Sequence, residues 1–480
     1  MATLLPAKPV SPETAFKVAW TQTYIMNTRF ADAGYLACEY KPATDNLRPI
    51  FCRDGNTLAY VADYEPEGFV VVSADDDLFP IITYAEYGSF PWQEDSHNVL
   101  LNMIRYDLGK RIKLVEVSSP EIISMNNDLW DKLEAGEIQS LTSDESWPAA
   151  GETWTGGWVE SMWHQSEPFN QFCPTDPLTG YRCIVGCVAT AMGQIVAYWQ
   201  YPPSVTFTTE DNYVTWAREI EIHAPDANFT GIDYRGGSPT NSTCAKISFA
   251  CGVGSRMDYT SNWSAAYPEN SANSFKKHFK YQRADRKLED DSDFYAVLEE
   301  NMKAAKPAML WINETDTASG GHEIVCDGYR IFGHAPEWHL NYGWGVGNPN
   351  PLPSSWYFLP YGLPYYPFVI EGVVNIEPGS GIAEDKQPPE DSPSKLTPEL
   401  KVNAAEIFYH LPEPSRVKIR LFDSAGRCVR VLIDEMQSYG DHTIVWDGKD
   451  ERGYRLPKGC FFLKLETKSG SRNQRIIIVH

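Results

Sequence analysis

One stretch of this sequence, residues 379–400, divides the chain into parts that must fold separately. It reads GSGIAEDKQPPEDSPSKLTPEL, rich in proline, serine and acidic residues and nearly free of large apolar side chains. Such a composition cannot bury enough apolar surface to offset the conformational entropy lost on folding. We therefore expect residues 379–400 to be an extended linker that joins residues 1–378 to an independent module at 401–480.

The C-terminal module, residues 401–480, has the pattern of an all-β domain. Its apolar-rich runs RVKIRLF, HTIVW, CFFLKLE and RIIIV are separated by turn signals such as SAG and KSG. Short strands at regular spacing are typical of a β-sandwich. The module carries 14 Lys and Arg against 10 Asp and Glu, whereas the whole chain has a net charge of −23. This step in charge supports a separate module.

Charge, hydropathy and cysteine usage limit the possible partners and cofactors. A strongly acidic chain disfavours nucleic acid and anionic membrane surfaces. No run of about eighteen apolar residues occurs, so the sequence predicts no membrane span. The ten cysteines show no CxxC spacing and no zinc-like cluster, so we expect no metal and no cofactor. The first residues, MATLLPAK, lack the features of a signal peptide. The chain is therefore either cytosolic or numbered from after a removed signal.

The N-terminal part has the pattern of an α+β domain. Residues 68–90 contain two β-rich runs around an Asp-rich turn, and residues 120–138 have an amphipathic helical pattern. Small, polar and proline residues follow at 140–155, which indicates a domain boundary. We place an N-terminal domain at residues 1–145 and the next domain at 146–378.

The sharpest local feature of the second domain is a cysteine at the start of an apolar helical run. The run is IVGCVATAMGQIVAYW, and Cys187 directly follows a glycine that permits a sharp turn. A helix N-terminus presents unsatisfied N–H groups and a partial positive charge, which favour a thiolate. A buried core cysteine fits the same pattern, because free cysteines are commonly buried. This element alone leaves both interpretations open.

A catalytic cysteine needs a base, and His322 is the best placed of the ten histidines. It lies in SGGHEIVCDGY, where glycines lead into a β-rich run, so that a strand would hold the ring at the mouth of a cleft. It follows Cys187 by 135 residues, within the separation of roughly 130–150 that papain-like enzymes show. We interpret His339 as a packed strand residue and His164, a rival base, as structural.

Three further side chains are placed to assist this pair. The segment HLNYGWG contains Asn341 and Trp344, an amide that can hold an imidazole in its productive tautomer and an aromatic ring that can shield it from water. Upstream, WHQSEPFNQFC places Gln165 before the nucleophile. Its side-chain amide and the N–H of Cys187 would together form an oxyanion hole.

Residues from about 9 to 376 resemble the streptopain family of papain-like cysteine peptidases. The segments that carry the resemblance are WHQSEPFNQFC, VGCVATAMGQIVAYWQYP, CGVGSRMDY, GGHEIVCDGY and HLNYGWG. The resemblance implies an α+β fold with a papain-like core of two subdomains. It also implies these roles: nucleophile Cys187, proton acceptor His322, oxyanion donor Gln165, histidine-orienting or shielding residues Asn341 and Trp344, and substrate contacts Ser264 and Gly321.

This sequence departs from the family at two places near these residues. Tyr342 stands where the family usually has Trp, and WSAA at 263–266 replaces a more glycine-rich loop.

The resemblance also covers the N-terminal domain, through PVSPETAFKVA and GFVVVSADDDLFPIITYAEYGSF. In this family that domain is an inhibitory propeptide that covers the cleft and is removed on activation. We expect cleavage in or near residues 143–153, the alternative being a permanent structural domain.

The C-terminal module resembles the Ig-like modules of flagellar hook-assembly proteins and of type IX secretion sorting domains. The most specific matching strings are VWDG and LPKG. This resemblance implies export, anchoring or adhesion at a cell surface, and so a secreted bacterial enzyme that can engage secretion or cell-surface machinery.

The sequence therefore predicts the zymogen of a secreted cysteine endopeptidase. It would hydrolyse protein or peptide substrates through a thioester on Cys187, with its own N-terminal domain as intramolecular inhibitor. A papain-like acyltransferase or transglutaminase would use the same residues, and product analysis with an amine acceptor separates it from a hydrolase. A non-enzymatic surface adhesin with a relic peptidase core is a further alternative.

Overall fold

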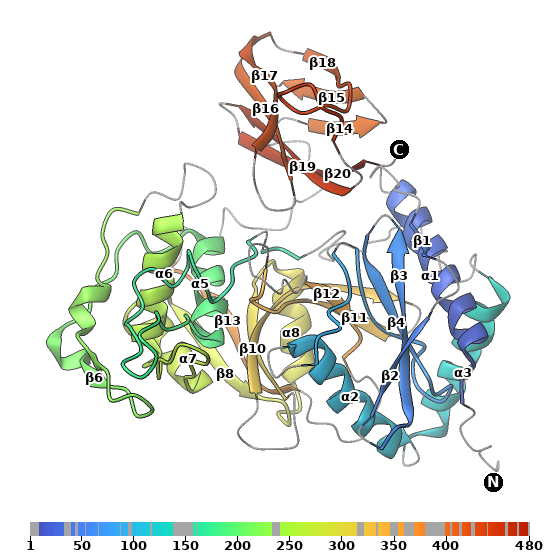
Figure 1. The fold of residues 1–480 in the computed structure, drawn as a ribbon, viewed down its shortest axis with the longest axis horizontal. Helices are drawn as coiled ribbons and strands as arrows, with labels where there is room; N and C mark the ends of the chain where they lie inside the picture. The colour runs from blue at the N-terminus through green and yellow to red at the C-terminus, as the bar shows by residue number, and fades with distance from the viewer. Residues whose placement is uncertain are drawn as a thin grey trace.

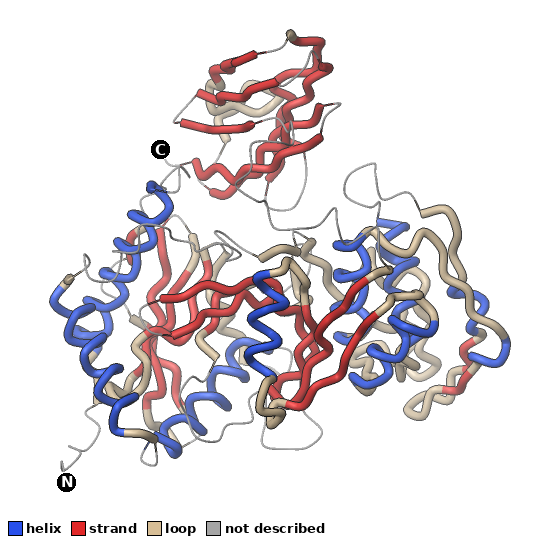
Figure 2. The backbone as a smooth tube through the Cα atoms, turned by 180° about the vertical axis from the view of Figure 1, so that it is seen from behind, coloured by secondary structure: helices blue, strands red, loops and turns tan. Residues whose placement is uncertain are grey.

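The computed structural model describes most of the chain in three regions of secondary structure (Figures 1 and 2). The described residues are 9–32, 40–43, 47–52, 54–65, 67–86, 88–94, 98–115, 118–137, 157–159, 161–232, 241–313, 321–332, 335–345, 354–359, 369–379, 399–403, 406–411, 415–423, 428–438, 440–456, 459–467 and 470–478. The cleavage region expected at 143–153 and nearly all of the expected linker lie outside these residues.

One antiparallel sheet of eleven strands runs through the first two regions (Figure 1). The strand order is β1-β3-β4-β5-β12-β11-β10-β9-β13-β8, with β2 paired to β3. The N-terminal strands are β1 (Lys41–Pro42), β2 (Arg48–Phe51), β3 (Thr57–Glu65), β4 (Phe69–Ser73) and β5 (Ile81–Ala85). The later strands are β8 (Arg283–Leu288), β9 (Ala308–Asn313), β10 (Gly321–Phe332), β11 (Ala335–Asn341), β12 (Ser355–Tyr357) and β13 (Val369–Glu377).

The N-terminal strands are apolar on both faces because helices cover both. These helices are α1 (Pro12–Asp32), α2 (Val99–Val115) and α3 (Pro120–Ala135). In β4, Phe69 and Val71 belong to the core that contains α2, whereas Val70 and Val72 belong to the core that contains α1 and α3. Successive side chains of a strand point to opposite faces, so a fully apolar strand fits a sheet between two helical layers.

The sheet continues from the N-terminal region into the next one through the pairing of β5 with β12. Thr83 pairs with Tyr357 and Tyr84 pairs with Trp356 in an antiparallel register. The Thr83 hydroxyl also lies 2.9 Å from Oγ of Ser355. The two regions therefore share one sheet and the hydrophobic cores on its two faces.

The central helices pack on one face of the later strands. They are α5 (Cys187–Trp199), α6 (Asn241–Gly254) and α7 (Pro268–Lys277), and α8 (Phe294–Lys303) lies on the opposite face. The short elements are η1 (Thr209–Asp211), β6 (Tyr213–Val214), β7 (Glu221–Ile222) and η2 (Ala224–Ala227). Met309 and Val325 face the α5 core, whereas Leu310 and Ile324 face the α8 core. This arrangement confirms the predicted α+β fold, with a helical subdomain beside a sheet subdomain.

The C-terminal region folds as the predicted sandwich of two antiparallel sheets. One sheet contains β14 (Glu399–Asn403), β15 (Glu406–Leu411) and β18 (Gly440–Val445); the other contains β16 (Ser415–Asp423), β17 (Cys428–Gln437), β19 (Gly459–Thr467) and β20 (Gly470–Ile478). Its core includes Ile419, Leu421 and Leu463. The strand β14 begins within the last residues of the expected linker.

Three properties of the described part of the chain bear on partners. No helix there is both long and apolar enough to cross a membrane. Nor do three or more His, Cys, Asp or Glu side chains of that part gather as metal ligands. Eight cysteines of that part are not in a disulfide bond: Cys52, Cys173, Cys183, Cys187, Cys244, Cys251, Cys326 and Cys428.

A buried charge cluster lies where the two regions share the sheet. Arg330 of β10 forms an ion pair with Glu337 of β11, and its guanidinium lies 3.7 Å from the centre of a Trp356 ring. From the N-terminal region, Tyr84 donates to Glu337 at 2.8 Å and Glu86 lies 3.9 Å from Arg330. All these side chains are buried, so each charge depends on its partner.

We expect Arg330→Met to lower the free energy of unfolding by about 3–5 kcal/mol, because it leaves Glu337 buried without its cation. Arg283→Met is the control, since the side chains of the Arg283–Asp285 ion pair are 53% and 35% exposed and such a solvent-accessible pair should contribute about 0–1 kcal/mol. Urea unfolding followed by tryptophan fluorescence measures both. Equal losses for the two variants would contradict the dependence of this junction on the buried pair.

Candidate active site

Cys187 is the first residue of α5, and the glycine before it makes the turn into the helix. Gly186 has φ 87° and ψ 144°, a conformation that is essentially restricted to glycine. The first-turn N–H groups of a helix have no acceptor within the helix and carry partial positive charge. Cys187, the nucleophile predicted from the sequence, therefore lies where the helix N-terminus stabilises a negative charge. That charge can be on the cysteine sulfur or on a group bonded to the sulfur.

The same glycine is in close contact with the segment that contains Ser264. A Cβ atom at position 186 would lie 2.6 Å from Sδ of Met257 and 3.0 Å from the carbonyl oxygen of Ser264. The Ser264 hydroxyl donates to the carbonyl of Ile184 at 2.9 Å. The segment 257–264 thus forms a wall beside Cys187. The Ser264 hydroxyl fastens this wall to Ile184 by a hydrogen bond, and the Ser264 carbonyl lies next to Gly186.

His322 lies in the strand β10, and its ring makes a definite hydrogen bond. Its Nε2 lies 2.7 Å from the backbone carbonyl oxygen of Tyr342. A carbonyl can only accept, so Nε2 carries the proton and the neutral ring keeps its lone pair on Nδ1. The Trp344 ring stacks alongside at 6.3 Å between centroids with an interplanar angle of 16°. The imidazole is thus fixed in one tautomer beside the Trp344 ring.

Burial has a strong effect on the charge of this histidine. The His322 side chain is 5% exposed, and burial lowers its pKa to about 4, against the opposing effect of the Tyr342 carbonyl. In the full chain His322 is therefore neutral at physiological pH.

Asn341 has partners other than the imidazole. Its Nδ2 donates to the carbonyl of Ser161 at 2.9 Å and to Oε1 of Gln194 at 3.1 Å, and its Oδ1 accepts from the N–H of Gly343 at 3.1 Å. These contacts tie the loop after β11 to α5 and to the segment before Gln165. The predicted role of Asn341 in orienting His322 stays a prediction; the recorded contacts make it an anchor of the loop.

Gln165 is brought to the site by its backbone. Its carbonyl accepts from the N–H of Val185, two residues before Cys187, at 2.9 Å. The preceding Trp163 accepts from Gly345 at 3.2 Å and donates to Gln194 of α5 at 3.0 Å. Hydrogen bonds on both sides thus hold this segment between the turn into α5 and the loop that carries Trp344. Gln165 itself is buried.

Gly321 is needed for close packing beside His322. A Cβ atom there would overlap the indole ring of Trp311 on the neighbouring strand β9. Sequence reasoning missed Trp311, because its contact depends on the β9–β10 register, in which Gly321 pairs with Asn313. It also missed Gln194, for which a buried polar side chain inside an otherwise apolar helix was the available signal.

The two other histidines near the site are held by contacts of their own. Nδ1 of His339 lies 2.6 Å from Asp327, and both side chains are buried. The ring of His164 packs edge-on against Phe169, and its Nδ1 accepts from the N–H of Ser166 at 3.3 Å. Burial lowers the pKa of His164 to about 4. Both residues fit the structural roles expected for them.

A chain of hydrogen bonds links Tyr342, whose carbonyl accepts from His322, to the N-terminal region. The Tyr342 hydroxyl lies 2.8 Å from Oγ of Ser355, which in turn lies 2.9 Å from the hydroxyl of Thr83. Tyr342 is one of the two departures from the family pattern, and its hydroxyl makes this link possible.

Family comparisons agree with this geometry over all three regions. Residues 163–350 match the Peptidase C10 family, residues 7–107 match the Spi protease inhibitor, and residues 395–471 match the FlgD Ig-like domain. The resemblances predicted from the sequence, to streptopain-like peptidases and to flagellar hook-assembly Ig-like modules, are thereby confirmed.

Individual relatives point the same way. The chain is 25% identical over 295 residues to the thiol protease/hemagglutinin PrtT of Porphyromonas gingivalis, covering 58% of this chain and 32% of PrtT. It is 24% identical over 312 residues to streptopain of Streptococcus pyogenes, covering 60% of this chain and 71% of streptopain. The chain thus spans about a third of the length of PrtT.

A solved structure shares the fold. A mutant fragment of Prevotella intermedia prointerpain A superposes with a TM-score of 0.50 at 21% identity, covering 70% of this chain and 99% of the fragment.

We expect Gly186→Ala to destabilise the chain more than Gly55→Ala. Gly55 has a similar φ of 89°, but a Cβ there would meet nothing within 4 Å, so that variant measures the backbone strain alone, about 1–2 kcal/mol. Gly186→Ala adds overpacking against Met257 and Ser264, about a further 1–3 kcal/mol. Urea unfolding compares the two. A loss no larger than that of Gly55→Ala would contradict the close packing at Cys187.

We expect His322 to make the chain sensitive to acid. Its pKa is about 4 in the folded chain and about 6.5 when unfolded, so the unfolded chain takes up the proton first as the pH falls. The stability is complete above about pH 6.5 and declines towards pH 4, by about 3 kcal/mol for this one group.

The measurement compares the free energy of unfolding at pH 7 and pH 4.5 for the wild type and His322→Gln. The variant should lose less stability on acidification. The same loss in both proteins would show that His322 does not titrate as its burial implies.

Proposed function

We propose that this chain is the zymogen of a secreted endopeptidase with Cys187 as nucleophile. The premise is that the chain carries a peptidase C10 family domain and is a cysteine-type peptidase. The observation that carries the proposal is that three segments contact one another: the Gln165 segment, the turn into α5 at Cys187 and the loop after Asn341. Hydrogen bonds fasten the Gln165 segment to the turn before Cys187 on one side and to the loop after Asn341 on the other.

The proposed reaction begins with proton transfer from the Cys187 thiol to Nδ1 of His322. The resulting thiolate attacks the carbonyl carbon of the scissile peptide bond and forms a C–S bond. The Tyr342 carbonyl supports the imidazolium, because it accepts from Nε2 in both charge states of the ring. Trp344 limits access of water to one face of the ring.

The oxyanion of the tetrahedral intermediate is stabilised by the Gln165 side-chain amide and the N–H of Cys187. The intermediate collapses when His322 gives its proton to the leaving amine and the C–N bond breaks. A water molecule then loses a proton to His322 and attacks the thioester. The acid product leaves and the thiol is restored.

Latency follows from the state of His322 in the full chain. Burial lowers the pKa of His322 to about 4, so the ring is a weak acceptor for the Cys187 proton and the thiolate–imidazolium pair is disfavoured. The N-terminal region, which matches a protease inhibitor, shares a sheet and cores with the strands around His322. We infer that it holds the site in this inactive state until cleavage within 143–153.

Secretion is part of the proposal and rests on two supports. The named relatives PrtT and streptopain are bacterial proteases. The C-terminal region matches an Ig-like domain, which has no proposed catalytic residue and suits attachment to secretion or cell-surface machinery.

A time course of intact mass tests nucleophile and self-processing together. We expect the purified wild-type chain to acquire a new N-terminus between residues 143 and 153, and the Cys187→Ala chain to stay intact under the same conditions. Gln165→Ala should process about 100- to 1,000-fold more slowly, because it removes one oxyanion donor. Normal processing by Cys187→Ala would refute the mechanism.

The same preparations separate hydrolysis from acyl transfer. Peptide cleavage is followed with and without a primary amine in excess. A hydrolase gives the free acid in both cases, whereas an acyltransferase gives mostly the amide when the amine is present.

A further inference from the structure

Two tryptophans beside the candidate active site are left exposed to solvent. Trp216 is 77% exposed and Trp263 is 38% exposed. Their rings lie 5.8 Å apart between centroids at an angle of 44°. They come from different loops: Trp216 from the turn between β6 and β7, and Trp263 from the WSAA segment in which this chain departs from its family. Exposing two adjacent indoles is unfavourable in water, so a binding role is indicated.

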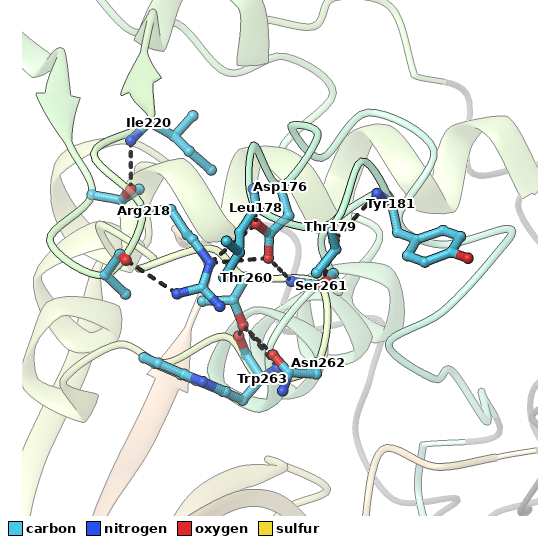
Figure 3. Close-up of polar contacts among 12 residues, drawn as sticks. Asp176, Leu178, Thr179, Tyr181, Arg218, Ile220, Thr260, Ser261, Asn262 and Trp263 are labelled. Carbon is cyan, nitrogen blue, oxygen red and sulfur yellow. Dashed lines mark hydrogen bonds and ion pairs between the residues drawn. The ribbon is translucent and has the colours of Figure 1, made fainter.

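These loops are held rigidly by a buried carboxylate, Asp176 (Figure 3). Asp176 accepts from Arg218 of the Trp216 loop at 3.0 Å and from the N–H of Ser261 of the Trp263 loop at 2.9 Å. Burial acts to raise its pKa, but the hydrogen bonds from Ser261, Leu178 and Arg218 prevail and lower it to about 2. Asp176 is therefore ionised at physiological pH, and its hydrogen bonds join the Trp216 loop to the Trp263 loop.

Local hydrogen bonds fix each tryptophan within its own loop. The N–H of Trp263 donates to the hydroxyl of Thr260 at 2.9 Å, and that hydroxyl also bonds the carbonyl of Trp263. Across the Trp216 turn, Thr215 and Ile220 exchange hydrogen bonds of 2.9 Å through the Thr215 N–H and hydroxyl. The loop backbones that carry the two indoles are therefore preorganised, which reduces the backbone entropy lost when a ligand packs on them.

The indole pair is continuous with the wall of the active site. Trp263 directly precedes Ser264, whose carbonyl borders Gly186 and whose hydroxyl bonds Ile184. A substrate backbone extended along this wall advances about 3.3 Å per residue. A substrate side chain that packs on Trp263 therefore belongs to a residue a few positions from the scissile bond, because Trp263 adjoins the residue whose carbonyl borders Gly186. Tyr181, also exposed, is excluded, because its ring points away from Trp263 in Figure 3.

We propose that Trp216 and Trp263 form a subsite for an aromatic or large apolar side chain of the peptide substrate, three or four residues before the scissile bond on the acyl side. The inference rests on the proposed peptidase function and adds to it a determinant of specificity. The two rings present apolar faces in the tilted arrangement that aromatic side chains favour. Of the charged groups beside them, Arg218 and Asp176 are paired with each other.

The test uses two pairs of peptides with one common leaving group, which differ only by Phe or Gly at the third or at the fourth acyl-side position. The activated wild-type chain should prefer Phe over Gly in kcat/KM by about three- to tenfold at one of these positions, as expected for one aromatic contact. Trp263→Ala and Trp216→Ala should each reduce this ratio towards one, because each removes part of the surface on which the Phe side chain packs. Trp263→Phe should keep most of the preference.

Tyr181→Ala is the matched control, because Tyr181 is also an exposed aromatic residue of the same region, at 75%, but its ring points away from Trp263. It should leave the ratio unchanged. A wild-type enzyme that cleaves both peptides of each pair equally well, or variants that keep the full preference, would overturn the subsite and leave the peptidase proposal standing. No cleavage of any peptide by the activated wild-type chain would overturn both proposals.

Discussion

The candidate site depends on the packing of α5 against the sheet. Val188, Ala191 and Ile195 of the helix share one core with Met309 and Val325 of β9 and β10. Cys187 is the first residue of the helix and His322 is the second residue of the strand, so this contact joins the elements that carry two residues 135 positions apart. At the same interface, Gln194 makes a pair of amide hydrogen bonds with Asn341. An apolar core provides the stability of the contact, and the buried amide pair gives it a defined register.

The parts of this arrangement that depend on local pattern could be predicted from the sequence. The glycine-led apolar run predicted a helix that begins at Cys187, and a glycine-led β run predicted the strand of His322. The C-terminal strands followed from alternation and turn residues in the same way. In each case the signal is a side-chain period or a turn residue that a single segment contains.

The parts that depend on register or on the backbone could not be predicted. The imidazole partner is the carbonyl of Tyr342, and a backbone carbonyl has no sequence signature. The contact of Trp311 with Gly321 follows from a cross-strand register that neither strand encodes alone. Likewise, Thr83 meets Ser355 across 272 residues. The sequence placed Asn341 in the loop near His322 as expected. Its partners Ser161 and Gln194, however, come from distant segments that the local pattern does not reveal.

The single sheet shared by the N-terminal and central regions has a kinetic consequence. Hydrolysis of one peptide bond between residues 137 and 157 removes no hydrogen bond of the β5–β12 ladder and leaves the Arg330 cluster intact. Before the cut, the tether keeps the N-terminal region at an effective concentration on the order of millimolar. After it, the two pieces are an ordinary complex governed by mass action. The onset of activity would then be a dissociation that is more complete on dilution, and the cut would only make it possible.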